Sequence, residues 1–431
     1  MEYLPILVLV LSFVVLLGIG TPVAWSIAIS SVLTMLVSIP VLPAFTTVSQ
    51  RIGTGLDSFA LLAIPLFILS GELMNKGGIA HRLIAFAKTM VGALPGGLAL
   101  INIVSAMLMG AIAGSSMAAA SAMGSILGPE MEREGYSREF GAAVNITAAT
   151  TGLVIPPSNV LIVYSLASGG ASIAALFLAG YIPGILTGLF LMIVASFWAK
   201  KKGYKVGKRS SLKEIFKTFV DALPSLFMLV VVIGGIVVGV FTATEASAIA
   251  VLYSLLLGFF YKEISFDRLP KILLDSTSTT AIVMLLIGAS MSMSWALSYE
   301  NIPQEISSGL LGISDNKIVI LLIINLLLLF VGIFMDMTPA VLIFTPIFLP
   351  VVTKLGLDPV HFGIIMVLNL CIGLCTPPVG SVLFVGVGIA NTTIEKVIKP
   401  LFPLFIAMII ALFLVTYIPQ LSLWLPSLFD L

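Results

Sequence analysis

Long apolar runs, separated by short breaks rich in Gly, Pro and charged residues, make up most of the chain. A membrane-spanning helix uses about 20 consecutive apolar residues. The uninterrupted runs cover residues 4–20, 22–38, 56–74, 173–198, 222–241, 245–261, 277–298 and 400–424. The pattern predicts an all-α polytopic membrane protein, because the strands of a transmembrane barrel alternate and form no such runs.

Four further apolar runs are each interrupted near the middle by residues that break a helix. The interruptions are Gly114-Ser115-Ser116 in residues 97–129, Pro156-Pro157-Ser158-Asn159 in residues 139–167, Asp336-Met337-Thr338-Pro339 in residues 318–351, and Thr376-Pro377-Pro378 in residues 360–390. Proline removes a backbone donor and pushes the preceding residue out of helical geometry. We expect residues 97–129 and 318–351 to form re-entrant hairpins, and the other two runs to form broken helices.

The basic residues predict how these segments are oriented. Eight of the 21 Lys and Arg residues lie between Lys200 and Lys217, which places this loop in the cytoplasm. If each hairpin returns to its own side, 18 basic residues lie inside and only Arg51, Lys317 and Lys354 lie outside. The charges therefore favour two hairpins that enter from opposite sides, with both chain termini on the periplasmic side.

The two interrupted halves are weak repeats of each other. Five residues of the first half, Pro129, Gly135, Gly152, Pro156 and Pro157, recur 221 residues later as Pro350, Gly356, Gly373, Pro377 and Pro378. The order of features also repeats: a span, an amphipathic helix, a hairpin, a broken helix and a closing span. The amphipathic helix of the first half is predicted at residues 78–91, in the membrane interface. Because the hairpins open to opposite sides, the repeat is inverted, which is the architecture of secondary transporters.

Composition excludes several classes of protein. Hydrophobic residues make up 59% of the 431 positions, charged residues make up 10%, and the mean hydropathy is +1.18. These values exclude a soluble globular domain, a disordered chain and a coiled coil. A net charge of +1 gives no argument for nucleic-acid binding. Met1-Glu2-Tyr3 carries no basic region, so we expect the first apolar run to be retained rather than cleaved.

The four interruptions carry the candidate chemistry. Backbone carbonyls freed within a membrane cost several kcal/mol unless a group binds them, and a cation is one such group. Hydroxyl oxygens at the same depth come from Ser115, Ser116, Ser158, Thr338 and Thr376. Neutral oxygen ligands suit Na⁺, and the amino termini of half-helices can hold a carboxylate. The alternative is that Pro and Ser only kink buried helices, but four breaks in symmetric pairs argue against it.

Other polar residues near the breaks have less defined roles. Asn145 and Asn369 precede the two Pro-Pro breaks, and their amides could steady the unwound backbone. Asp336 could bind a cation or cap the half-helix that follows it, and the sequence leaves both open. Buried thiols are the preferred interpretation of Cys371 and Cys375.

Candidate chemistry of other kinds has little support. His81 and His361 have no partner at metal-ligand spacing, so both are interpreted as structural, and no transition-metal site is predicted. Nucleotide-binding and hydrolase motifs are missing from the sequence, which argues against an enzyme and against ATP-driven transport.

Several segments resemble the large membrane subunit of tripartite ATP-independent periplasmic (TRAP) transporters. They read QRIGTGLDSFALLAIPLFILSGELMNKGGIAHRL from Gln50, then GAIAGSSMAAASAMGSI, GLVIPPSN, FTATEA, GIFMDMTPAVLIFTPIFLP and CTPPVG. The resemblance implies a Na⁺-coupled elevator importer in the bacterial inner membrane. It also implies a periplasmic binding protein that delivers an organic anion, such as a C4-dicarboxylate or sialic acid, and a small four-helix membrane subunit. Because the chain starts at the large subunit, we expect the small one to be a separate polypeptide.

Residue chemistry and the resemblance together give the predicted sites. The predicted Na⁺ site comprises Gly114, Ser115, Ser116, Asn145, Pro156, Asp336, Thr338, Asn369, Thr376 and Gly380. The predicted substrate site comprises Ser115, Ser116, Pro157, Ser158, Asn159, Thr338, Pro377 and Pro378. No organic cofactor is expected.

The elevator interpretation divides the chain into a scaffold and a moving transport domain. Residues 1–55, 56–96, 171–316 and 392–431 are assigned to the scaffold and its arms, and residues 97–170 and 317–391 to the transport domain. Three other functions remain open at this point. They are a stand-alone Na⁺/dicarboxylate symporter without a binding protein, an intramembrane enzyme that uses Asp336, and a passive channel.

Overall fold

The computed structural model describes residues 4–207, 209–314 and 316–431, and within these ranges it contains helices and no strand. Lys208 of the predicted basic loop and the first three residues lie outside the described residues. The first half contains α1 (Leu4–Gly18), α2 (Val23–Ser38), α3 (Val41–Leu56), the short 3-10 helix η1 (Phe59–Leu62), α4 (Ala63–Lys76), α5 (Ile79–Val91), α6 (Gly97–Ala113), α7 (Ser116–Arg133), α8 (Arg138–Thr151), α9 (Asn159–Ala167) and α10 (Ile173–Lys202). The second half contains α11 (Leu212–Val237), α12 (Ala243–Phe260), α13 (Leu269–Tyr299), α14 (Ile302–Ile313), α15 (Lys317–Phe334), α16 (Met337–Lys354), α17 (Pro359–Gly373), α18 (Ser381–Ile389), α19 (Ile394–Tyr417) and α20 (Gln420–Ser427).

The predicted repeat is present in the helix boundaries. α16, α17 and α19 each begin 221 residues after α7, α8 and α10. The hairpins are α6–α7 and α15–α16, and the broken helices are α8–α9 and α17–α18. The prediction of an all-α membrane protein with two hairpins and two broken helices is therefore confirmed.

Each hairpin crosses its broken helix through a pair of glycines. A Cβ atom on Gly110 of α6 would lie 2.5 Å from the Cα atom of Gly152, which follows α8. A Cβ atom on Gly373 of α17 would lie 2.5 Å from the Cα atom of Gly332 on α15. Only glycine allows this approach, because real Cβ atoms do not come so close to backbone. Both crossings therefore bring a hairpin directly onto the segment that precedes a Pro-Pro break.

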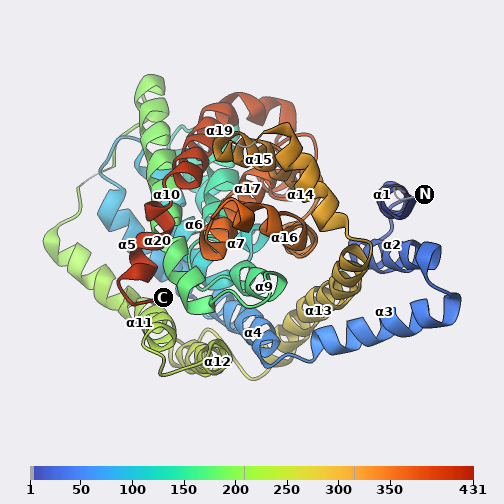
Figure 1. Ribbon diagram of the computed structural model, residues 1–431. Coiled ribbons are helices and arrows are strands. Elements are labelled where there is room, and N and C mark those ends of the chain that lie inside the picture. Colours follow the sequence, from blue (N-terminus) through green and yellow to red (C-terminus); the bar gives the residue numbers. More distant parts are fainter. Residues whose placement is uncertain (1–3, 208, 315) are drawn as a thin grey trace.

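The two repeats interlock in the middle of the molecule, where α9, α16 and α17 lie together (Figure 1). α7 of the first hairpin packs against α18, and α16 of the second hairpin packs against α9. Most of the buried apolar side chains form one continuous cluster around these helices. α1, α2 and α3 lie at one edge, where α2 and α3 contact α13 (Figure 1).

Two amphipathic helices occupy segments for which the sequence pattern gave no helix boundaries, although the repeat predicted an amphipathic helix before the second hairpin. Residues 41–56 form α3, and α14 occupies much of the polar stretch from Tyr299 to Lys317. Both helices bury one narrow face, so neither has the continuous apolar run of a membrane span. α14 precedes the second hairpin as α5 precedes the first, which completes the repeat.

Candidate functional site

The tip of the first hairpin is a two-residue turn. Gly114 ends α6 with φ of +60°, a conformation that favours glycine. Ser115 caps α7, and its Oγ atom accepts a hydrogen bond from the Ala118 N–H at 3.3 Å. Ser116 is the first residue of α7 and is buried. The predicted position of both serines at the tip is correct, although the cap already uses one lone pair of Ser115.

The first broken helix unwinds between Thr151 and Asn159. The Pro156–Pro157 peptide bond in this segment is cis. The Ser158 hydroxyl donates a hydrogen bond to the Leu153 carbonyl oxygen at 2.6 Å. One freed carbonyl is thus satisfied by a side chain, and the Ser158 oxygen retains its lone pairs for a further partner.

The tip of the first hairpin lies against the first break. A Cβ atom on Gly114 would lie 2.7 Å from the Nδ2 atom of Asn159. The absence of a side chain at Gly114 therefore makes room for the amide of Asn159. Two residues that are 45 positions apart in the sequence form one site.

The second half has the same arrangement. The Gly380 N–H, which follows the Pro377–Pro378 cis peptide, donates to the Ile333 carbonyl oxygen at 3.1 Å, at the end of α15. The Thr376 hydroxyl donates to the Ile372 carbonyl oxygen at 2.7 Å, as Ser158 does in the first break. A backbone hydrogen bond therefore joins the second hairpin to the second break.

Asp336 and Thr338 lie at the tip of the second hairpin. Asp336 occupies the N-cap position of α16, with φ of −71° and ψ of 162°, but its side chain makes no capping hydrogen bond within the described chain. Its side chain is exposed, and that of Thr338 is half-buried. The geometry gives no side-chain cap at Asp336, so the cation-binding interpretation stays open.

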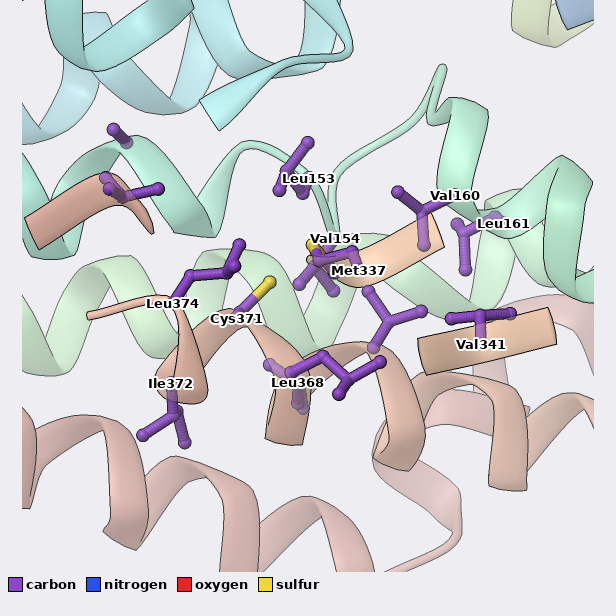
Figure 2. Close-up of a cluster of buried hydrophobic side chains, with 14 of the residues drawn as sticks. Leu153, Val154, Val160, Leu161, Met337, Val341, Leu368, Cys371, Ile372 and Leu374 are labelled. Carbon is purple, nitrogen blue, oxygen red and sulfur yellow. The ribbon is translucent and has the colours of Figure 1, made fainter. Parts of the chain in front are cut away.

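The two breaks also contact each other. Cys371 of α17 donates a hydrogen bond from Sγ to the Thr150 carbonyl oxygen of α8 at 3.2 Å. Figure 2 shows Leu153 and Val154 of the first break, Met337 of the second hairpin and Cys371 in one cluster of buried side chains. The cluster brings the first break, the tip of the second hairpin and the helix before the second break together.

The thiols and His361 have structural environments. Cys371 and Cys375 are free and buried, as predicted. The His361 Nδ1 atom lies 2.6 Å from the Ser422 Oγ atom, and the ring is buried. Among the residues that the structure describes, no three His, Cys, Asp or Glu side chains gather as a metal site would require.

Asn145 and Asn369 do not steady the unwound backbone, and that prediction is wrong. The Asn145 Nδ2 atom donates to the Ala120 carbonyl oxygen on α7 at 2.7 Å. The Asn369 Nδ2 atom donates to the Asn325 Oδ1 atom and to the Ile365 carbonyl oxygen, both at 2.8 Å. Each asparagine lies more than a helical turn before its break, so its short side chain cannot reach the unwound segment.

Sequence reasoning missed two buried asparagines that face these residues. Asn325 of α15 contacts Asn369, and its Nδ2 atom donates to the Thr416 Oγ1 atom at 3.1 Å. Asn102 of α6 is buried at the comparable place in the first hairpin. A single asparagine within each apolar hairpin arm was the available signal, because an asparagine is rare in such runs.

Comparisons with known proteins agree with this architecture. The family model described as "Tripartite ATP-independent periplasmic transporter, DctM component" matches residues 10–421. A Salmonella typhimurium protein named "Uncharacterized protein YgiK" is 56% identical, and the match covers 99% of both chains. The isethionate TRAP transporter permease protein DctMQ of Oleidesulfovibrio alaskensis is 41% identical, over 97% of this chain and 66% of that protein. The C4-dicarboxylate TRAP transporter large permease protein DctM of Pseudomonas aeruginosa is 40% identical, over 93% and 94% of the two chains.

Fold similarity reaches further than sequence similarity. The crystal structure of the Alcanivorax borkumensis YdaH transporter matches with a TM-score of 0.66 at 14% identity, covering 91% of this chain and 90% of that one. Eight helices of the described chain are long and apolar enough to cross a membrane, in agreement with a multi-pass inner-membrane protein. The relatives that carry functional names are transporter permeases, which excludes the interpretation as an intramembrane enzyme. Together, the family match over most of the chain and the identity to these permeases show that this protein belongs to the DctM family, the large permease components of tripartite ATP-independent periplasmic transporters.

Proposed function

We propose that this chain is the membrane subunit that carries an organic anion inward by coupling its transport to Na⁺. The observation that supports this proposal most directly is that both hairpins contact the breaks of the discontinuous helices at their tips. Gly114 lies against Asn159, and the Gly380 N–H binds the Ile333 carbonyl oxygen. Serine and threonine hydroxyls lie at these tips and breaks without any cluster of three or more His, Cys, Asp or Glu side chains among the described residues, and such neutral oxygens suit Na⁺ better than a transition metal.

The same region can hold the negative charge of the substrate. α7 and α16 begin at the hairpin tips, and α9 and α18 begin directly after the breaks. The amino terminus of a helix carries unpaired N–H groups and a partial positive charge, which favour a carboxylate or sulfonate. Cation and anion would therefore bind side by side, where their opposite charges favour each other's binding.

We further propose an elevator motion and a revised division of the chain. α10 packs along α6, α8, α17 and α19, and α19 packs along α8 and α17. These contacts support a moving body of α6–α10 and α15–α19, so residues 171–202 and 392–417 would move with the hairpins rather than belong to the scaffold. The amphipathic helices α5 and α14 would connect this body to the scaffold.

Substrate and partners follow from the family and its named members. Relatives are named for C4-dicarboxylates, sialic acid, isethionate and 2,3-diketo-L-gulonate, which share an anionic group. We propose a small organic anion of this kind, delivered by a periplasmic binding protein. The tripartite family favours this arrangement over a stand-alone symporter. We propose that the small membrane subunit is a separate chain, as the name "large permease protein" indicates for the relatives from Rhodobacter capsulatus and Pseudomonas aeruginosa.

Uptake into proteoliposomes tests the proposal. The chain would be reconstituted with its small subunit and binding protein, and radiolabelled succinate, sialic acid, isethionate and 2,3-diketo-L-gulonate would be compared. We expect one of these anions to accumulate, and only when the binding protein is present. Uptake that is unchanged when the binding protein is omitted would favour a stand-alone symporter instead.

A further inference from the structure

A cavity of about 310 Å³ lies beside the first hairpin, between α7, α8 and α18. Glu132, Ser137 and Arg138 line one end, where the turn between α7 and α8 faces the side that the basic residues predict to be cytoplasmic. Asn102 and Asn145 line it within the protein, and both are almost completely buried. The cavity therefore extends from the predicted cytoplasmic surface towards the hairpin tip.

Glycines create this cavity. Gly128 of α7 and Gly141 of α8 both line it. A Cβ atom on Gly128 would meet no described atom within 4 Å, and one on Gly141 would meet only Met131 atoms, at 3.7 Å. Side chains would fit at both positions, so the space is not a by-product of tight helix packing.

The equivalent space in the second repeat is filled. At the offset of 221 residues that relates α7 to α16 and α8 to α17, Gly128 corresponds to Leu349, Gly141 to Phe362 and Asn145 to Met366. Phe362 and Met366 are fully buried. The inverted repeat is therefore hollow on the side predicted to be cytoplasmic and packed with large side chains on the side predicted to be periplasmic.

The buried asparagine amides of the two repeats also differ in their hydrogen bonding. The Oδ1 atoms of Asn102 and Asn145 have no hydrogen-bond partner among the described residues. In the second repeat, Asn325 and Asn369 bond to each other, although the Oδ1 atom of Asn369 also lacks a partner in the described chain. A buried oxygen without a partner is costly, and a hard cation with its hydration water satisfies it.

The charges at the mouth of the cavity give no attraction for an anion. Arg138 is the basic residue of the lining, and its Nε atom lies 2.7 Å from the Glu132 Oε1 atom, with a second contact of 3.0 Å between Nη2 and Oε2. The guanidinium is thus neutralised by its own neighbour and offers little to an anion. What remains at the inner end is a pair of amide oxygens.

We infer that this cavity is the route by which the coupling cation leaves towards the cytoplasm, with Asn102 and Asn145 as its oxygen ligands, and that Leu349, Phe362 and Met366 close the equivalent route on the periplasmic side. The inference rests on the proposed Na⁺ coupling. The release path would then run between α7, α8 and α18, separate from the binding of the ion at the hairpin tips.

Filling the cavity with the residue of the second repeat tests the inference. Gly128→Leu should lower the maximal rate of Na⁺-driven uptake by about ten-fold, which corresponds to a barrier higher by about 1.4 kcal/mol. Gly128→Ala should have a smaller effect. The Na⁺ concentration at half-maximal uptake should stay within about two-fold, because the tips are unchanged. Gly388→Leu is the matched control, since it adds the same side chain at an exposed position of α18 where no described atom lies within 4 Å.

Normal maximal rates in Gly128→Leu, or an equal loss in Gly388→Leu, would overturn the inference. A second measurement does not depend on uptake. Gly128→Cys should react with a charged thiol reagent from the cytoplasmic side. Thr345 is buried beside Met366, at the position that corresponds to Gly124 of the cavity lining, so Thr345→Cys should not react from the periplasmic side. The native cysteines are buried and give little background. An unreactive Gly128→Cys would overturn the inference even if the proposed Na⁺ coupling holds, and labelling as expected without Na⁺ dependence of uptake would reject the coupling.

Discussion

Gly114→Ala perturbs the contact between the first hairpin tip and the first break. Gly114 has φ of +60°, and a residue with a Cβ atom in this left-handed conformation costs about 1–2 kcal/mol. The new Cβ atom would also lie 2.7 Å from the Asn159 Nδ2 atom, so the amide must move. If Asn159 helps to form the ion site, the Na⁺ concentration at half-maximal uptake should rise by about ten-fold, which is about 1.4 kcal/mol of binding energy.

Gly135→Ala separates the two parts of this effect. Gly135 has φ of +86° at the base of the same hairpin, and a Cβ atom there meets no described atom within 4 Å. Both variants carry the backbone cost, so both should lose similar thermal stability in detergent. Only Gly114→Ala should change the Na⁺ dependence. Equal Na⁺ dependence in the two variants would show that the contact with Asn159 has no part in ion binding.

Four further predictions concern the second half and the topology. Thr338→Ala should raise the half-saturating Na⁺ concentration by about ten-fold, because a lost buried polar contact costs about 1–3 kcal/mol; Na⁺ titration of uptake measures this. Asp336→Asn should impair uptake more severely than Thr338→Ala if the carboxylate binds the ion, and unimpaired uptake would show that it does not. Gly373→Val should reduce the yield of folded protein in size-exclusion chromatography, because its side chain would collide with Gly332. Cysteines replacing Lys202 and Lys354 should be labelled from opposite sides of the membrane, and labelling from the same side would contradict the inverted repeat.

The breaks and the repeat could be predicted from the sequence because each depends on local chemistry. Proline and glycine interrupt a helix wherever they occur, so the four interruptions gave both hairpins and both broken helices. The helix α3 was missed, and α14 was predicted only through the repeat and without bounds, because a narrow apolar face gives a weaker signal than a membrane span. The boundaries of the long helices were also uncertain, because apolar residues continue past their ends.

The partners of the polar side chains could not be predicted. Asn145 binds Ala120 on the neighbouring hairpin arm, and Asn369 binds Asn325 on another helix. Such pairs depend on how helices far apart in the sequence cross, which a single chain does not reveal. Ser158, by contrast, donates to the Leu153 carbonyl oxygen, only five residues away. A hydrogen bond this local is one that the sequence alone can predict.

Na⁺-driven uptake in proteoliposomes tests the central claim most directly. With the small subunit and binding protein present and no ATP, an inward Na⁺ gradient should drive accumulation of the substrate anion above its external concentration. Thr338→Ala should shift this dependence to higher Na⁺. Equal uptake when K⁺ replaces Na⁺ on both sides of the membrane would contradict a Na⁺ site formed by the hairpin tips and the broken helices.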